Sequence, residues 1–446
     1  MIMKHCPACG EDRVCKGARE IWEEDGISVL TCQACESAVM DPPPGKDYSS
    51  HTLDDEAIRD YVEMNCAIDA LVAFLLPAIE LVKPTRYLDV GCGFGFSLDI
   101  VRRLTGAEVL GVEPAHYGRV GSKMLNLPIL AEVLTGVPDE QSNAQLSQLF
   151  DLIFSSEVIE HIPDPDTLFA TIRAFLKPGG MAVISTPRAE SLLEDITLSE
   201  KRAVISPGAH VFLYTAKAFE AAARRAGFEH VEIRTVGVTQ ILYASETQFV
   251  LPDVDINAAV QKYLTNALEE NADEPLLGIG LAQRLFRLLI QTGDWEVAEK
   301  ASQYFRTRGA PPDIKYTRYR DYLADFRACE AVLSYHKAML HLNHRAAFTH
   351  AFEEFRNAFR FCLQVLRTAP GSSVSEADIV WLSVFHAALA ASHERRPDLA
   401  KDIWREVVAA IADGDMPTMP TAIRARIRDD LRRDYQPPSA MMAHTD

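Results

Sequence analysis

A glycine-rich pentapeptide, Gly91-Cys92-Gly93-Phe94-Gly95, has the composition of a turn whose backbone a ligand can approach closely. It follows an apolar run at residues 87–90, which contains Asp89, and Glu113 closes the next apolar run, 18 residues after Gly95. This order, a strand followed by a glycine turn, a helix, a second strand and an acid, predicts a nucleotide-type ligand at the carboxyl edge of a parallel sheet. The acid would accept hydrogen bonds from the ribose hydroxyls of that ligand. The spacing is G-x-G-x-G rather than the G-x-G-x-x-G of dinucleotide enzymes, and no G-K-[ST] phosphate loop accompanies it.

A second group able to do chemistry is a set of four cysteines, arranged as Cys6-x-x-Cys9 and Cys32-x-x-Cys35 with 22 residues between the two pairs. Each pair brings two thiols into one turn, and two pairs predict a tetrahedral zinc site rather than disulfides. Four cysteine ligands leave no open coordination position, so this zinc is expected to be structural. A redox C-x-x-C is the weaker interpretation, because no thioredoxin-type βαβ pattern surrounds either pair.

The elements that must position these groups follow from the apolar pattern. Apolar runs at residues 87–90, 109–112, 149–155 and 181–185 alternate with helix-like segments, which predicts a parallel sheet, and a third strand is expected near residues 128–130. Helical patterns are also expected at residues 54–76, at residues 67–82, which overlap the first range, and at residues 216–226. A closing pair of strands is expected at residues 231–234 and 247–251.

Three motifs in order resemble those of class I S-adenosylmethionine-dependent methyltransferases. Residues 87–95 look like the first motif of that family, residues 150–165 like its fourth strand and following loop, and Leu176-Lys177-Pro178-Gly179-Gly180 like the turn before its fifth strand. The resemblance covers about residues 54–252 and implies an α/β fold, a Rossmann-like seven-stranded domain that binds S-adenosylmethionine. Residues 6–48 resemble the zinc ribbon fused ahead of such domains in polysaccharide and antibiotic-sugar pathways.

The resemblance also assigns roles to single residues. The backbone at Gly91 and Gly93 would face the amino-acid end of the cofactor, Asp89 would orient that end, and Glu113 would hold the ribose. Glu132 is the nearest match to the acid that the family often has at the adenine. The full set of expected cofactor-binding residues is Asp89, Gly91, Gly93, Gly95, Glu113, Glu132, Ser155 and Glu157, the last two because they follow the fourth strand at the carboxyl edge.

Two histidines are the candidate catalytic residues. His161 lies in the loop after the fourth strand, and His210 lies in a segment that resembles the H-x-x-x-[YF] stretch of related methyltransferases. A hydroxyl acceptor has a pKa far above 7, so O-methylation benefits from a histidine base. For both residues a purely structural hydrogen bond is the alternative. Arg188 is a candidate for binding an anionic substrate group, with a plain surface arginine as its alternative.

After residue 252 the strand pattern stops, and leucines at positions 281, 285, 288 and 289 indicate an amphipathic helix. Val297, Ala301, Tyr304 and Phe305 repeat this spacing and predict a second apolar stripe. The segment at residues 293–301 resembles a tetratricopeptide-type helical hairpin, and residues 397–403 would be a second copy; an irregular helical bundle is the alternative. His341, His344 and His350 cluster there without ligand-type spacing to acids or cysteines, which favours ordinary surface or core histidines.

The composition excludes some classes of protein. The net charge of −18 disfavours a nucleic-acid surface, and no apolar run approaches the roughly 20 residues that span a membrane. The first residues, Met1-Ile2-Met3-Lys4-His5-Cys6, lack a signal-peptide pattern, so a cytoplasmic location is expected.

The predicted organisation is therefore a zinc ribbon (residues 1–48), a methyltransferase domain (49–252), a helical domain (253–436) and a disordered tail (437–446). We expect a methyltransferase that O-methylates a small-molecule or glycan-type acceptor. A lipid or quinone methyltransferase is one alternative; a catalytically silent docking protein, which would bind a protein partner through the helical domain, is another.

Overall fold

The computed structural model describes residues 6–11, 19–24, 26–44, 53–65, 67–138, 145–194, 196, 198–302, 315–368, 374–417, 419 and 423–425. The chain folds as two compact units, Met1–Leu53 with Ala67–Asn266, and Asp54–Cys66 with Ala267–Asp446. The boundaries expected at residues 48 and 252 stay predictions, and so does the tail at 437–446, which lies outside the described residues.

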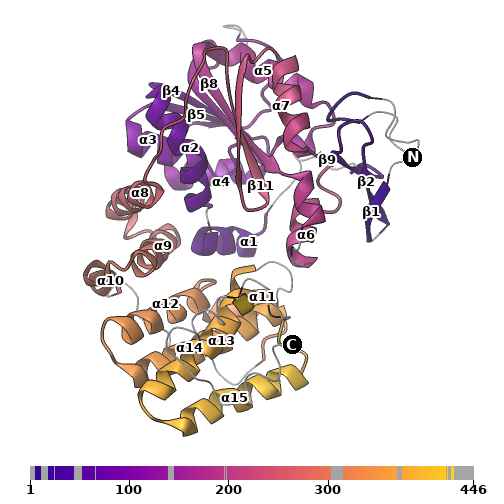
Figure 1. The fold of residues 1–446 in the computed structure, drawn as a ribbon. Coiled ribbons are helices and arrows are strands. Elements are labelled where there is room, and N and C mark those ends of the chain that lie inside the picture. Colours follow the sequence, from indigo (N-terminus) through magenta and orange to yellow (C-terminus); the bar gives the residue numbers. More distant parts are fainter. Residues whose placement is uncertain are drawn as a thin grey trace. The chain divides into compact units, whose positions relative to one another are not determined.

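A seven-stranded sheet forms the centre of the first unit, in the order β10-β11-β8-β7-β4-β5-β6 (Figure 1). Neighbouring strands from β8 to β6 are parallel, whereas β11 is antiparallel to both of its neighbours. This is the Rossmann-like seven-stranded fold expected from the sequence, and even the two-residue third strand is present. The strands are β4 (Arg86–Val90), β5 (Glu108–Val112), β6 (Ile129–Leu130), β7 (Phe150–Ser156), β8 (Leu176–Pro187), β10 (His230–Val236) and β11 (Thr239–Ser245).

Helices cover both faces of this sheet (Figure 1). On one side α2 packs against α3, and α3 against α4; on the other side α5 packs against α7 and β8, and α7 against β10 and β11. The bounds of the helices are α2 (Ile68–Val82), α3 (Phe96–Thr105), α4 (His116–Leu125), η4 (Ile159–His161), α5 (Pro165–Phe175), η5 (Ala189–Leu193), α6 (Leu198–Ile205) and α7 (Ala216–Arg225).

A smaller antiparallel sheet combines the cysteine-rich segment with a distant strand, in the order β1-β2-β3-β9. Its strands are β1 (Arg19–Glu24), β2 (Ile27–Thr31), β3 (Ala38–Asp41) and β9 (Phe212–Leu213). Ala38 of the cysteine-rich segment is thus paired with Leu213, far along the chain, a contact that the sequence did not indicate.

Two predicted segments differ from the structure. The closing strand pair includes Thr239–Ser245 rather than residues 247–251, because Gly237, with φ of +57°, makes a two-residue hairpin in which Val236 pairs with Thr239. The single helix predicted over residues 54–76 is also wrong. It is interrupted at Ala67, whose φ of +49° is left-handed and cannot continue a right-handed helix.

The second unit is helical, as expected. Its helices bury one apolar core, in which the aromatic rings of Phe326 and Phe361 meet at 5.1 Å between centroids. The predicted stripe of leucines at 281, 285, 288 and 289 is buried, but Val297, expected on a second stripe, is 39% exposed. Tyr304 and Phe305 of that stripe lie outside the described residues, and the tetratricopeptide resemblance stays a prediction.

The helices of this unit are α1 (Asp55–Asp60), η3 (Tyr61–Asn65), α9 (Leu277–Thr292), α10 (Trp295–Ala301), α11 (Tyr319–Asp325), α12 (Glu330–Asn343), α13 (Phe348–Thr368), α14 (Val374–His393) and α15 (Pro397–Ala412); α8 (Ile256–Asn271) begins in the first unit and ends in the second. No single helix among the described residues is long and apolar enough to cross a membrane, and one pair of consecutive helices, Asp55–Met64 with Ile68–Val82, reaches that length and composition only when taken together.

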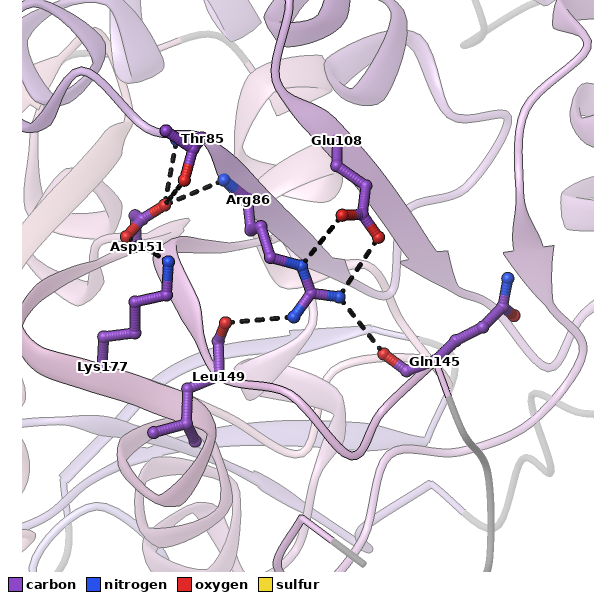
Figure 2. A network of polar contacts seen from close by, with 7 residues as sticks. All are labelled: Thr85, Arg86, Glu108, Gln145, Leu149, Asp151 and Lys177. Atoms are coloured by element: carbon purple, nitrogen blue, oxygen red, sulfur yellow. Dashed lines mark hydrogen bonds and ion pairs between the residues drawn. The ribbon is translucent and has the colours of Figure 1, made fainter. Parts of the chain in front are cut away.

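A polar network ties together the amino-terminal edge of the sheet (Figure 2). Asp151, at the start of β7, accepts hydrogen bonds from the Thr85 amide and hydroxyl, the Arg86 amide and the Lys177 ammonium. Partial burial opposes ionisation, but these donors lower the pKa of Asp151 to about 2. Arg86 itself bonds to Glu108 and to the carbonyl of Leu149.

We expect Asp151→Asn to destabilise the protein by about 2 kcal/mol, because several donors lose a charged acceptor. The depressed pKa adds a pH dependence: the contribution of Asp151 is present above about pH 4 and is lost as the pH falls toward 2. Urea unfolding of both proteins at pH 7 measures the difference. The control is Glu108→Gln on an exposed carboxylate, which should change stability by less than about 0.5 kcal/mol.

Candidate functional site

The glycine turn lies at the carboxyl end of β4, as predicted. Gly91, Gly93 and Gly95 have φ angles of +76°, +56° and +86°, which side chains rarely adopt. Gly95 is also the residue before the first turn of α3, and its carbonyl accepts from the Asp99 amide at 3.1 Å. The three glycines therefore have a backbone reason for their positions at the carboxyl end of β4.

Glu113 is joined to this turn by direct hydrogen bonds. Its Oε2 accepts from the Gly93 amide at 3.1 Å and its Oε1 accepts from the Ala115 amide at 2.9 Å. Only 5% of the residue is exposed, and this burial raises the pKa of Glu113 while the two amides oppose the rise. Each carboxylate oxygen has a second lone pair, so the carboxylate can accept two more hydrogen bonds from a ligand.

Asp89 is the second acid at this edge and is 2% exposed. Its Oδ2 accepts from the Ser97 hydroxyl, whereas its Oδ1 is buried and has no hydrogen-bond partner among the described residues. Burial raises the pKa of Asp89 to about 7, with Ser97 opposing the rise and Glu113 adding to it. A buried carboxylate oxygen without a donor is costly, which favours a ligand that supplies one.

The loop after β7 lies against the glycine turn. A Cβ added to Gly91 would come closer than 3.0 Å to a methyl carbon of Val158, so glycine is required for this close approach. In the same loop Glu157 has a left-handed backbone, with φ of +55°, and its carboxylate accepts from the Ser185 hydroxyl at 3.3 Å. Ser155 is fully buried and its hydroxyl donates to the carbonyl of Val90, so it links β7 to β4.

Two residues after Val158, Glu160 begins a cluster with the two candidate histidines. Oε1 of Glu160 lies 3.8 Å from Nε2 of His161 and 3.9 Å from Nε2 of His210, and the ligand atoms of all three residues lie within 4.8 Å of one another. The structure thus brings together His161 and His210, which are 49 positions apart in the sequence.

Backbone carbonyls fix the ring orientation of both histidines. Nδ1 of His161 bonds to the carbonyl of Ala209 at 3.1 Å, and Nδ1 of His210 to that of Val204 at 2.8 Å. Because a carbonyl only accepts, each Nδ1 donates, and each neutral ring presents Nε2 as an acceptor toward Glu160.

The electrostatics of the cluster favour uncharged side chains. Burial, together with Glu157, raises the pKa of Glu160 well above its ordinary value. Burial, together with His161, lowers the pKa of His210 to about 3. Oε1 of Glu160 is buried without a hydrogen-bond partner among the described residues. Two Nε2 atoms and this oxygen could accept from a substrate hydroxyl or hold a divalent cation.

Two other candidates, Glu132 and Arg188, have no hydrogen bond to these groups among the described residues. Glu132 is exposed, two residues after the end of β6. Arg188 is engaged, since its guanidinium donates to both carboxylate oxygens of Glu194 at 2.6 Å and to the carbonyl of Gly237. The structure therefore does not join either residue to the acids or to the histidines by the hydrogen bonds of its described residues.

The four cysteines converge. The sulfur atoms of Cys6 and Cys35 are 3.7 Å apart and those of Cys9 and Cys32 are 3.9 Å apart, and all four lie within 4.8 Å of one another. A disulfide would require about 2.0 Å. Four sulfurs placed tetrahedrally around zinc at about 2.3 Å would be separated by about 3.8 Å. The cysteine geometry therefore fits a tetrahedral metal ion.

Sequence reasoning missed three participants. Ser97 and Ala115 bond to the two acids, and Glu160 completes the histidine cluster. Ser97 and Ala115 carry no recognisable sequence signal, because amide and hydroxyl donors are common and only the folded chain brings these two to the acids. Glu160 had one: an acid directly before His161 and three residues after Glu157 places both carboxylates on one turn.

Comparison with known proteins identifies the central region. Residues 61–233 match a family model described as a methyltransferase domain. Curated relatives are ubiquinone biosynthesis O-methyltransferases, for example from Bordetella avium, with 31% identity over 150 residues, which are 32% of this chain and 62% of the relative. The relative from Proteus mirabilis is 34% identical over 23% of this chain and 41% of its own length. The chain therefore spans about half the length of these relatives.

Among solved structures, human N-acetylserotonin methyltransferase in complex with S-adenosylmethionine is similar over 43% of this chain and 56% of that chain, with 14% identity and a TM-score of 0.34. A similarity at this level carries no inference about the site, so the fold rests on the sheet order described above.

Proposed function

We propose that this chain, whose central domain belongs to the class I S-adenosylmethionine-dependent methyltransferases, transfers the methyl group of S-adenosylmethionine to an acceptor hydroxyl. The observation that carries the proposal is the placement of the turn, Asp89 and Glu113 at one sheet edge, with Glu113 hydrogen-bonded to Gly93 of the turn. A silent docking protein, the alternative of another class, would not need a buried carboxylate kept ready for a ligand.

The residues present fit S-adenosylmethionine. Bound there, it supplies an activated methyl group on a sulfonium for in-line displacement. The unpartnered Oδ1 of Asp89 offers an acceptor to the ammonium at the amino-acid end, and the open lone pairs of Glu113 offer acceptors to two ribose hydroxyls. Gly91 and Gly93 let the backbone come close, and Glu132 would lie nearest the adenine.

The raised pKa of Asp89 gives a pH-dependent prediction. Below about pH 7 the carboxyl is protonated in the free protein and cannot pair with an ammonium. The affinity for S-adenosylhomocysteine should therefore rise with pH, by up to about tenfold between about pH 6 and pH 8, and Asp89→Asn should flatten the dependence. Calorimetric titrations at three pH values check this, with Asp166→Asn on an exposed carboxylate as the control. An unchanged slope in Asp89→Asn would assign the titration to another group.

On the acceptor side, His161 and His210 would orient the hydroxyl and accept its hydrogen bond. A pKa of about 3 makes His210 a weak proton acceptor, so positioning contributes more than general base catalysis at this residue. If a divalent cation binds Glu160 and both Nε2 atoms, it would lower the pKa of the acceptor hydroxyl instead. A requirement of turnover for added Mg²⁺ or Mn²⁺ would favour activation by a bound cation over positioning by the histidines alone.

The acceptor class stays between two candidates. The relatives named for ubiquinone biosynthesis favour a hydroxyl on an aromatic, quinone-type ring. A glycan-type small molecule is the other candidate, suggested by the resemblance of the cysteine-rich segment to the ribbons of sugar-modifying enzymes. Both are O-methylations, so the proposed transfer to oxygen is the same for either acceptor class.

The four cysteines would hold a structural zinc, supported by sulfur separations of 3.7 Å and 3.9 Å. Atomic emission spectroscopy of purified protein should show about one zinc per chain, which should be lost in a Cys9→Ser variant.

The helical unit remains a candidate for binding a protein partner, and a cytoplasmic location fits both the enzymatic and the partner-binding proposal.

The test of the function uses S-adenosylmethionine carrying a ¹³C methyl group and two sets of acceptors, catechol- or quinol-type aromatics and neutral glycans. The carbon shift of the product separates O-methyl from N- and C-methyl groups. An O-methyl product with either set supports the proposal, and the set that reacts selects the acceptor class. Exclusive N- or C-methylation would contradict it.

A further inference from the structure

The cysteine-rich segment is bonded to the part of the chain that carries His210. We call residues 204–215 the His210 segment. Strand β3 of the cysteine-rich segment pairs with β9 of the His210 segment, through Ala38 with Leu213 and Val39 with Phe212. The Met40 amide adds a hydrogen bond to the carbonyl of Val211 at 3.0 Å, one residue after His210.

The second cysteine pair makes the closest polar contacts with this segment. The carbonyl of Cys35 accepts from the Thr215 hydroxyl at 2.8 Å, and the Ser37 hydroxyl accepts from the Thr215 amide at 3.2 Å. Ser37 is fully buried and Thr215 is 6% exposed, so water does not replace these bonds easily. The conformation of the turn after Cys35 therefore decides whether the end of the His210 segment keeps its partners.

Apolar packing reinforces the same connection. Buried residues of β2 and β3, of the His210 segment and of η5 form one core cluster, which contains Val29, Ala38, Met40, Ala189, Leu192, Val204, Ile205 and Leu213. Val204 is also the residue whose carbonyl holds Nδ1 of His210. The face of the small sheet thus supports the residue that orients the histidine.

The other end of the connection is the histidine cluster. The His210 segment supplies the carbonyls for both rings, from Val204 to His210 and from Ala209 to His161. The Val211 amide donates to the backbone carbonyl of Glu160 at 2.8 Å. A shift of the His210 segment would consequently move all three members of the cluster.

We infer that the four-cysteine ribbon is a positioning element for the acceptor half of the active site, holding the His210 segment so that Glu160, His161 and His210 stay together. This role rests on the proposed function, which makes that cluster the acceptor half. The hydrogen bonds described for the donor half connect Asp89 with Ser97 and Glu113 with Gly93 and Ala115, all of them outside the ribbon. Loss of the ribbon contacts should therefore disturb the acceptor half and spare cofactor binding.

The experiment compares the full-length protein with Ser37→Ala, which removes the acceptor for the Thr215 amide and keeps all four cysteines. The matched control is Ser28→Ala, on β2 of the same ribbon. Hydrogen exchange measured by mass spectrometry should be about tenfold faster in peptides covering residues 204–215 of Ser37→Ala. Peptides covering residues 86–95 should be unchanged, and the affinity for S-adenosylhomocysteine should stay within about twofold.

A second readout follows the histidine itself. In protein labelled with ¹⁵N-histidine, the ring signal of His210 is assigned by its absence in His210→Gln. This signal should report a proton on Nδ1 in the wild type and a mixture of tautomers in Ser37→Ala. A Cys9→Ser variant, which loses one of the four sulfurs proposed to hold zinc, should show both effects more strongly.

Two results would overturn the inference: unchanged exchange and ring signals in Ser37→Ala, or faster exchange everywhere, including residues 86–95. The second would make the ribbon a general stabilising element. If the wild type fails to bind S-adenosylhomocysteine, the proposed function fails, while the exchange and ring measurements still decide whether the ribbon holds the His210 segment.

Discussion

Glu113→Ala should weaken binding of S-adenosylhomocysteine by about 10²- to 10³-fold, or about 3 to 4 kcal/mol. In the proposed complex the Glu113 carboxylate accepts from two ribose hydroxyls, and the residue is only 5% exposed to water. Alanine removes both acceptors and leaves the amides of Gly93 and Ala115 without their partner. The turn therefore loses its hydrogen bond to residue 113 as well as the ligand contact. Calorimetric titration measures the combined loss of affinity for S-adenosylhomocysteine.

Two variants make this result specific. Glu113→Gln keeps one oxygen as an acceptor and should lie between the wild type and alanine. Glu108→Ala, at the exposed start of the same strand, should bind normally, because its partner Arg86 lies at the opposite edge of the sheet. Unchanged affinity in Glu113→Ala would show that the ribose is held elsewhere.

Gly121→Ala should lower stability by about 3 kcal/mol and weaken cofactor binding by about tenfold or more. Intrinsic helix propensity predicts the opposite, since alanine in α4 is better than glycine by about 1 kcal/mol. The deciding fact is the close approach of α4 to the glycine turn. A Cβ on Gly121 would lie 2.5 Å from the carbonyl carbon of Phe94, and closer still to its oxygen. Because both atoms are backbone, either the helix or the turn must move.

Thermal unfolding and calorimetry of Gly121→Ala measure the two effects. Lys123→Ala, on an exposed position of the same helix, is the control and should change neither quantity appreciably. A Gly121→Ala protein that is more stable and still binds would mean that α4 does not approach the turn as described.

The sequence predicted well those features that depend on neighbouring residues. Asp89, the three glycines and Glu113 lie in one strand–turn–helix–strand unit, and their meeting at one sheet edge follows from parallel strands. The two cysteine pairs were similarly predictable, because each pair forms within one turn. In both cases the residue types carry the chemistry and short-range geometry brings them together.

Long-range and single-residue backbone effects were not predictable. The pairing of β3 with β9 joins Ala38 to Leu213, and no sequence pattern in either segment predicts this pairing. The hairpin at Gly237 and the break at Ala67 depend on single left-handed residues, which apolar periodicity does not detect. Glu160 carried a local signal beside His161, but its approach to His210 depends on the folded His210 segment and could not be predicted.

Methyl transfer itself is best tested by the formation of S-adenosylhomocysteine from S-adenosylmethionine, followed by mass spectrometry, in the presence of a small-molecule cell extract. We expect product with the wild type, almost none with Glu113→Ala, and strongly reduced product with His210→Gln at unchanged cofactor affinity. Saturable binding of S-adenosylhomocysteine without any turnover, with every extract fraction and with added Mg²⁺, would contradict methyl transfer and favour a docking protein that has kept its cofactor site.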